Sequence, residues 1–182
     1  MVADVNNRRN KAIKFTEKML REVKKSLPKS FQIPRIVVID FERYGLNNKA
    51  IGGYHNKSGD LYLNSKYDTK QKILDFVNRQ EGQFANKTEY AVLLHELGHK
   101  NYYDEIKNFT EKQGVSYNKA KKSIDTKIME CIEKNDINLE EAISRYAYEG
   151  YESGKYTETY AECFSVRNTN KIAESIIEMI KE

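Results

Sequence analysis

The sequence predicts an α+β fold, in which a few strands come early and helices make up the rest. Three observations support this class. A short apolar run rich in β-branched residues lies at 35–41, an alternating pattern with a turn follows at 50–65, and helical periodicity dominates after residue 67. At 182 residues, the chain is long enough to bury a core, and we expect one domain over 1–182.

The N-terminal segment 1–34 is expected to hold a long amphipathic helix at 5–27. Pro28 follows its end, where proline is common because it cannot continue a helix. The apolar residues that recur at helical spacing are Ala12, Phe15, Met19, Val23 and Leu27.

The strands are expected in two places. The run "RIVVIDF" (35–41) follows Pro34 and reads as a buried strand. Segments 50–56 and 61–65 flank the turn "KSGD", in which Gly59 tolerates a positive φ. This pattern predicts an antiparallel hairpin.

After residue 67, residues typical of helix N-termini divide the chain into several expected helices. Asp68 with Gln71, and Asn86 with Glu89, each match a capping pattern in which a polar residue is followed three later by Glu or Gln. The further helices are expected at 116–134, from Asn138 to about Gly150, near 155–167 and at 170–181.

Composition excludes several classes of protein. Hydrophobic residues are 39% and charged residues 32%, which is typical of a soluble globular chain. The net charge of +4 is weak, and the N-terminal lysines alternate with glutamates, which favours a solvated helix face over a phosphate-binding stripe. Two cysteines cannot form a disulfide framework. We therefore expect no nucleic-acid partner, no membrane span and no signal peptide.

The stretch "VLLHELGHKNYY" (92–103) carries the main chemical signal. His95 and His99 are four residues apart with Glu96 beside the first, which is the H-E-x-x-H pattern. On a helix, positions i and i+4 share a face, so two imidazoles can converge on one ion. The same letters also arise by chance, so the hypothesis needs a third ligand.

A catalytic zinc site usually has three protein ligands and one open position. The only other histidine is His55, so the third ligand is His55, a carboxylate or a cysteine. Glu158 and Glu162 are four apart in the rather apolar stretch "YESGKYTETYAECF" (151–164), and a buried carboxylate is costly unless it is paired or bound to metal. The alternative, that both glutamates face solvent, is left open by spacing alone.

The order "HELGH", then Tyr151, then "ETYAECF" resembles the catalytic core of the anthrax lethal factor type of zinc peptidase. That group includes the Pro-Pro endopeptidases and metallopeptidase-like domains of phage proteins. The resemblance covers about 50–166, including the hairpin. It implies a zincin-like fold of the gluzincin type, with a small antiparallel or mixed sheet, an active-site helix and a helical C-terminal half.

The resemblance also implies the chemistry, which is zinc-dependent hydrolysis of a protein or peptide substrate. His95, His99 and Glu158 would bind one zinc ion. Glu96 would take a proton from the zinc-bound water and pass it to the leaving amine. Tyr151 would donate a hydrogen bond to the oxyanion.

Supporting roles follow from the same resemblance. Glu162 would orient a ligand imidazole. An edge strand with Gly53, Tyr54 and His55 would bind the substrate backbone. Gly98 is expected where the helix lies close to a neighbouring element. Residues 107–148 depart from the pattern, and we expect a helical insertion that covers the cleft.

A second hypothesis comes from a different class. The chain would be a phage or mobile-element protein that uses a zincin fold for a structural or interaction purpose. An intact Glu96 favours the enzyme. The expected localisation is cytoplasmic or phage-associated, and the sequence does not indicate an oligomeric state.

Overall fold

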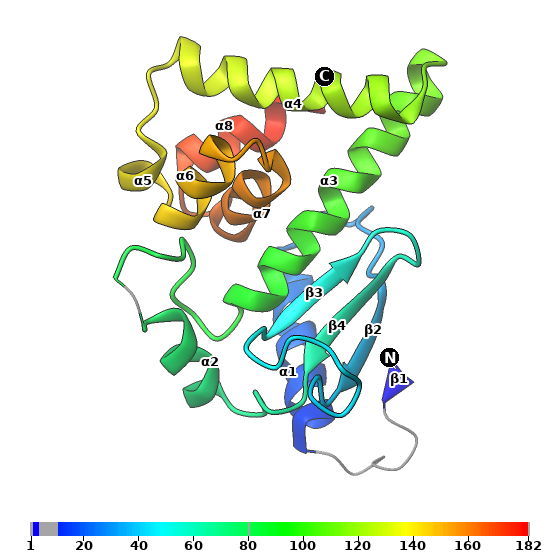
Figure 1. Cartoon of the computed structure of the whole chain (residues 1–182), viewed down its shortest axis with the longest axis vertical. Coiled ribbons are helices and arrows are strands. Elements are labelled where there is room, and N and C mark those ends of the chain that lie inside the picture. The colour runs from blue at the N-terminus through cyan, green and yellow to red at the C-terminus, as the bar shows by residue number, and fades with distance from the viewer. Residues whose placement is uncertain (1, 4–10, 80, 182) are drawn as a thin grey trace.

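The computed structural model describes residues 2–3, 11–79 and 81–181, and it confirms a mixed α and β fold that is mostly helical (Figure 1). The strands are β1 (Val2–Ala3), β2 (Arg35–Ile39), β3 (Gly52–His55) and β4 (Asp60–Asn64). The helices are α1 (Lys11–Ser26), α2 (Lys70–Val77), α3 (Ala91–Gln113), α4 (Tyr117–Lys134), α5 (Leu139–Ala142), α6 (Arg145–Glu152), α7 (Tyr156–Val166) and α8 (Lys171–Met179).

The described strands form one mixed sheet in the order β1-β2-β4-β3. The hairpin is confirmed: β3 pairs antiparallel with β4, and Gly59 in its loop has a φ of +71°. The strand expected at 35–41 is β2, which pairs parallel with β4 rather than with the first hairpin strand. Leu61 and Leu63 of β4 are buried, as expected for a strand between two neighbours. β3 is consequently an edge strand.

Helix α3 joins two parts of the molecule (Figure 1). Its N-terminal end lies beside the sheet, and its C-terminal end reaches the group of helices α4–α8. Buried apolar residues of α1, the sheet, α3, α4, α7 and α8 belong to one hydrophobic cluster. Residues 107–148 are mostly helical, as expected. They include the end of α3, which continues to Gln113, then α4, which begins after the Ser116 cap, then α5 and the first part of α6.

Two expected helix starts were wrong. The N-cap of α2 is Thr69, and Asp68 instead bonds the ammonium of Lys72 at 2.7 Å. Asn86 accepts a bond from Thr88 N in a turn, and α3 begins only at Ala91. The side chains of Asp68 and Asn86 therefore accept hydrogen bonds from nearby donors, Lys72 and Thr88, without capping a helix.

The helix expected from Asn138 to about Gly150 is two helices, and this was also wrong. α5 ends at Ala142, and α6 begins after Ser144, whose hydroxyl accepts from the N–H of Ala147 at 3.1 Å. The same hydroxyl donates to Glu162 at 2.9 Å. A tertiary contact therefore fixes Ser144 as a cap and interrupts a locally favourable helix.

The residues expected at helical spacing in the N-terminal segment behave as predicted over the described part. Ala12, Met19 and Val23 of α1 are buried, and residues 5–10 of the expected helix lie outside the described residues. Among the described helices, none combines the length and apolar composition needed to cross a bilayer.

Candidate metal centre

Helices α3 and α7 lie in direct backbone contact because of Gly98. A Cβ at Gly98 would lie 2.7 Å from the Cα of Ala161 and 3.0 Å from the Cβ of Phe164. Such distances do not occur between carbon atoms of packed residues, so glycine alone fits. The expectation of a close neighbour at Gly98 is thus confirmed, and the contact brings the histidine face of α3 against the glutamate face of α7.

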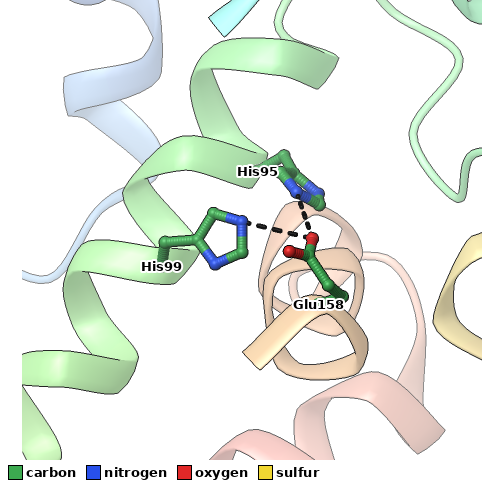
Figure 2. Close-up of side chains that lie close together, drawn as sticks. All are labelled: His95, His99 and Glu158. Atoms are coloured by element: carbon green, nitrogen blue, oxygen red, sulfur yellow. Dashed lines mark ion pairs between the residues drawn. The ribbon is translucent and has the colours of Figure 1, made fainter. Parts of the chain in front are cut away.

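Three donor atoms converge where these faces meet (Figure 2). Oε2 of Glu158 lies 3.3 Å from Nε2 of His95 and 3.4 Å from Nε2 of His99. These separations exceed the usual N–H···O range, whose upper end is about 3.2 Å. Two ligands bound tetrahedrally to zinc at about 2.0–2.2 Å lie roughly 3.3–3.6 Å apart. The observed spacing therefore fits a shared metal ligand set.

An unsatisfied atom supports the same interpretation. Oε2 of Glu158 is buried and has no hydrogen-bond partner among the described residues. Leaving a buried carboxylate oxygen without a partner costs free energy, and a cation at the meeting point of the three donors would remove that cost. The nitrogen and oxygen donors are also those that zinc takes in proteins.

Each imidazole is held through its other nitrogen. Nδ1 of His95 lies 2.8 Å from Oε1 of Glu162, and Nδ1 of His99 lies 2.9 Å from the hydroxyl of Thr157. Glu162 is buried, and its Oε2 accepts from the N–H of Ala85 at 2.6 Å and from Ser144. Both rings are thereby oriented with Nε2 toward Glu158, which is how outer partners prepare metal ligands.

The charges of this cluster are strongly coupled. Burial raises the pKa of Glu158, but the adjacent imidazoles of His95 and His99 outweigh burial and hold that pKa below its usual range. Burial lowers the pKa of His95, but the adjacent carboxylates of Glu158 and Glu162 outweigh burial and raise that pKa to about 10. These opposite shifts favour the charged forms of Glu158 and His95, and a cation bound by the three donors would compete with the proton on His95.

Glu96 faces the sheet rather than α7. It is buried, and its Cγ would be 3.0 Å from a Cβ at Gly52 of β3. Burial raises the pKa of Glu96, and the charges of His99 and His95 oppose that shift without cancelling it. Its Oε2 has no hydrogen-bond partner among the described residues. A carboxylate whose pKa is raised by burial, and which lies beside a metal-type cluster, is suited to accept a proton.

The structure does not bring Tyr151 to the cluster. The Tyr151 hydroxyl donates to Oε1 of Glu133 at 3.2 Å, and its ring meets Tyr156 edge-on. Tyr146 lies there instead, with its ring stacked on His95 at 5.6 Å and 22°. Burial and the charge of the nearby Glu158 carboxylate raise the pKa of Tyr146.

Sequence reasoning missed Tyr146 because its helix was expected to start six residues earlier. The available signal was Ser144, a good N-cap residue two positions before Tyr146. A cap at Ser144 places Tyr146 in the first turn of α6.

The expected substrate strand is β3. Gly52 and Tyr54 face α3, since Gly52 lies against Glu96 and Tyr54 stacks on Tyr103. Gly53 and His55 alternate to the other face. His55 is exposed, lies outside the metal-type cluster and pairs through Nδ1 with Ser58 at 2.9 Å.

A cavity of about 170 Å³ lies beside the cluster. His95, Glu96 and Tyr146 line one part of it, and Gly52 lies at its border. Much of the remaining wall is apolar and comes from α2, the segment before α3, and α3 itself, through Phe76, Val77, Phe84, Ala91 and Val92. Residues before β3 and polar residues of α7 complete it, among them Ile51, Glu162 and Ser165. The cavity has the size of one amino-acid side chain.

Comparison of the chain with protein-family models, with curated proteins and with solved structures gave no match.

Proposed function

We propose that this protein is a zinc-dependent endopeptidase with a zincin-like fold. The observation that supports it most strongly is the convergence of His95, His99 and Glu158 at 3.3–3.4 Å around an unsatisfied carboxylate oxygen. Bound there, one zinc ion would act as a Lewis acid and would lower the pKa of a bound water molecule to about 7.

Glu96 is the proposed proton carrier. Its burial raises its pKa, so it can accept a proton from the attacking water and later release it to the leaving amine. Its orientation toward β3, away from Glu158, leaves it free of the ligand set. Because it contacts the edge strand at Gly52, it lies on the side from which a substrate backbone would approach.

The substrate is proposed to be an extended peptide. Among the described strands, β3 pairs with β4 alone, so its other edge can bind a peptide backbone by strand addition. The apolar cavity beside Glu96 and His95 would accept one side chain next to the cleaved bond.

The test is a comparison of wild type with Glu96→Gln. Glutamine has nearly the same shape but cannot accept the proton. Zinc content should remain near one ion per chain, while cleavage of a mixed peptide library should fall by about 100- to 10,000-fold. If a cleaved peptide is found and the variant cleaves it at the wild-type rate, this peptidase mechanism is incorrect. If the wild type binds zinc and cleaves nothing, the fold serves binding, as in the second hypothesis.

A matched pair of variants identifies the oxyanion donor. The resemblance assigns this role to Tyr151, whereas proximity favours Tyr146, whose ring stacks on His95. Tyr146→Phe should lower the rate by roughly 100- to 1000-fold without loss of zinc. Tyr151→Phe should leave the rate near wild type. The reverse result would require Tyr151 to leave Glu133 and turn toward the substrate.

A further inference from the structure

A second open cavity, of about 500 Å³, lies at the other end of β3 from Gly52. Three tyrosines from different elements line it: Tyr54 from β3, Tyr103 from α3 and Tyr117 from α4. We call this group the tyrosine pocket. Lys57 and Lys107 lie at the same cavity. Tyr54 belongs to the expected substrate strand β3, and the other residues of this cavity have no role in the chemistry described above.

The tyrosine pocket continues the two elements that form the candidate centre. Tyr54 is two residues beyond Gly52 on the same face of β3, a distance of roughly 7 Å along a strand. Tyr103 is one helical turn beyond His99 on α3, a rise of roughly 6 Å. A peptide laid along the edge of β3 would reach this pocket about two residues away from the metal-type cluster.

The residues that line the tyrosine pocket favour an aromatic ring as the ligand group. Tyr54 and Tyr103 stack at 6.0 Å and 28°, and Tyr117 beside them is 43% exposed, so its ring is open to a ligand. Aromatic groups add to such surfaces by offset stacking or edge contact. A cationic guest is disfavoured because two lysines line the cavity, and the one acidic group there, Asp104, is paired with Lys100.

Lys57 and Lys107 favour an acidic residue in the peptide beside the bound aromatic side chain. Lys57 lies in the hairpin loop. Lys107 lies one turn past Tyr103, where it makes a long, exposed ion pair with Glu111 at 4.0 Å, so two positively charged side chains flank the pocket. An aspartate or glutamate beside the bound ring would complement them. Helix α4, in the segment that departs from the family pattern, supplies Tyr117, so this preference would belong to this chain rather than to its fold.

We propose that the tyrosine pocket binds an aromatic side chain of a peptide, next to an acidic residue, about two positions from the cleaved bond. This inference rests on the proposed peptidase function for the meaning of that bond. The binding itself is measured separately from cleavage.

The experiment uses zinc-loaded Glu96→Gln protein to select from a displayed library of random decapeptides. The selected peptides should be enriched in an aromatic residue beside Asp or Glu. Tyr117→Ala, an exposed change with little risk to folding, should weaken the best peptide by about 5- to 30-fold. Lys57→Ala with Lys107→Ala should remove the acidic preference alone. Tyr148→Ala, which alters another exposed tyrosine, should change nothing.

The proposal is overturned if no aromatic residue is enriched. It is also overturned if Tyr117→Ala and Tyr103→Ala keep the aromatic preference of the parent Glu96→Gln protein. The selected peptide is then offered to wild-type protein with zinc. Selective binding without cleavage would refute the peptidase function and leave the pocket standing. Cleavage without an aromatic preference would support the peptidase function and refute the binding role of the tyrosine pocket.

Discussion

Two regions of the molecule contribute differently to the candidate site (Figure 1). The sheet half consists of β1–β4 with α1 and α2, and the helical half consists of α4–α8. The helical half supplies Glu158 and the groups that hold the imidazoles, Glu162 and Thr157. The sheet half supplies the surface against which Glu96 packs and the edge strand β3. Helix α3 belongs to both.

The difference follows from helix geometry. His95 and His99 share one face of α3, and Glu96 is turned by about 100° because a helix has 3.6 residues per turn. That rotation points the ligands toward α7 and the proposed base toward β3. Metal binding and proton transfer should therefore be separable: changes in the helical half should alter zinc content, and changes in the sheet half should alter rate alone.

The largest effect should come from Glu158→Gln, which changes the proposed metal ligand that the helical half supplies. The amide is a poorer ligand, so zinc affinity should fall by more than the roughly 10- to 100-fold typical of outer residues. Competition with a chelator measures this. Added zinc should raise the Tm of the wild type and not that of the variant. Unchanged affinity would assign the third ligand to another residue.

Gly98→Ala should come next, because it pushes α3 and α7 apart. The new Cβ would lie 2.7 Å from backbone atoms of Ala161, which is overpacking against a rigid neighbour. The free energy of unfolding should fall by roughly 1–3 kcal/mol, as measured by urea denaturation. Gly53→Ala is the matched control, since a Cβ there meets nothing within 4 Å. Equal losses in both variants would contradict the close contact.

Gly52→Ala tests the sheet side. Its Cβ would lie 3.0 Å from Cγ of Glu96 and from Cγ1 of Val92, so the Glu96 side chain must shift. A displacement of about 1 Å at a reacting group can cost up to about 100-fold in rate. We expect a 10- to 100-fold lower kcat with the zinc content of the wild type. Loss of zinc in this variant would show that the two halves are not separable.

The smallest effect concerns an ion pair of the sheet half remote from the cluster. The hydrogen bonds of Arg35 to Asp60, at 2.7 and 2.5 Å, lower the pKa of Asp60 from near 3.8 to about 2. This pair therefore stabilises the fold fully at pH values well above 4, and its contribution is lost as the pH falls through about 2.

Arg35→Met should consequently lower the free energy of unfolding only slightly at pH 7, since Arg35 is exposed to solvent and its charge is screened. The difference from wild type should shrink as the pH falls through about 2 and should vanish only below that pH. Denaturation curves at several pH values check this, and zinc content should not change. A difference that is independent of pH would rule out the ion pair as its cause.

Local sequence determined the parts that depend on short-range periodicity. The hairpin around Gly59, the helix with His95 and His99 on one face, and the helix starting after Ser116 were predicted correctly. Each depends on contacts within a few residues, where spacing and turn chemistry decide the conformation.

Only the tertiary structure decided which residues meet. The parallel pairing of β2 with β4, the break at Ser144 and the stacking of Tyr146 on His95 all join segments distant in sequence. The meeting of His95 with Glu158 depends on Gly98 lying against Ala161, 63 positions away. Spacing places a side chain on a face of its own helix, but the partner of that face is selected by packing across the whole core.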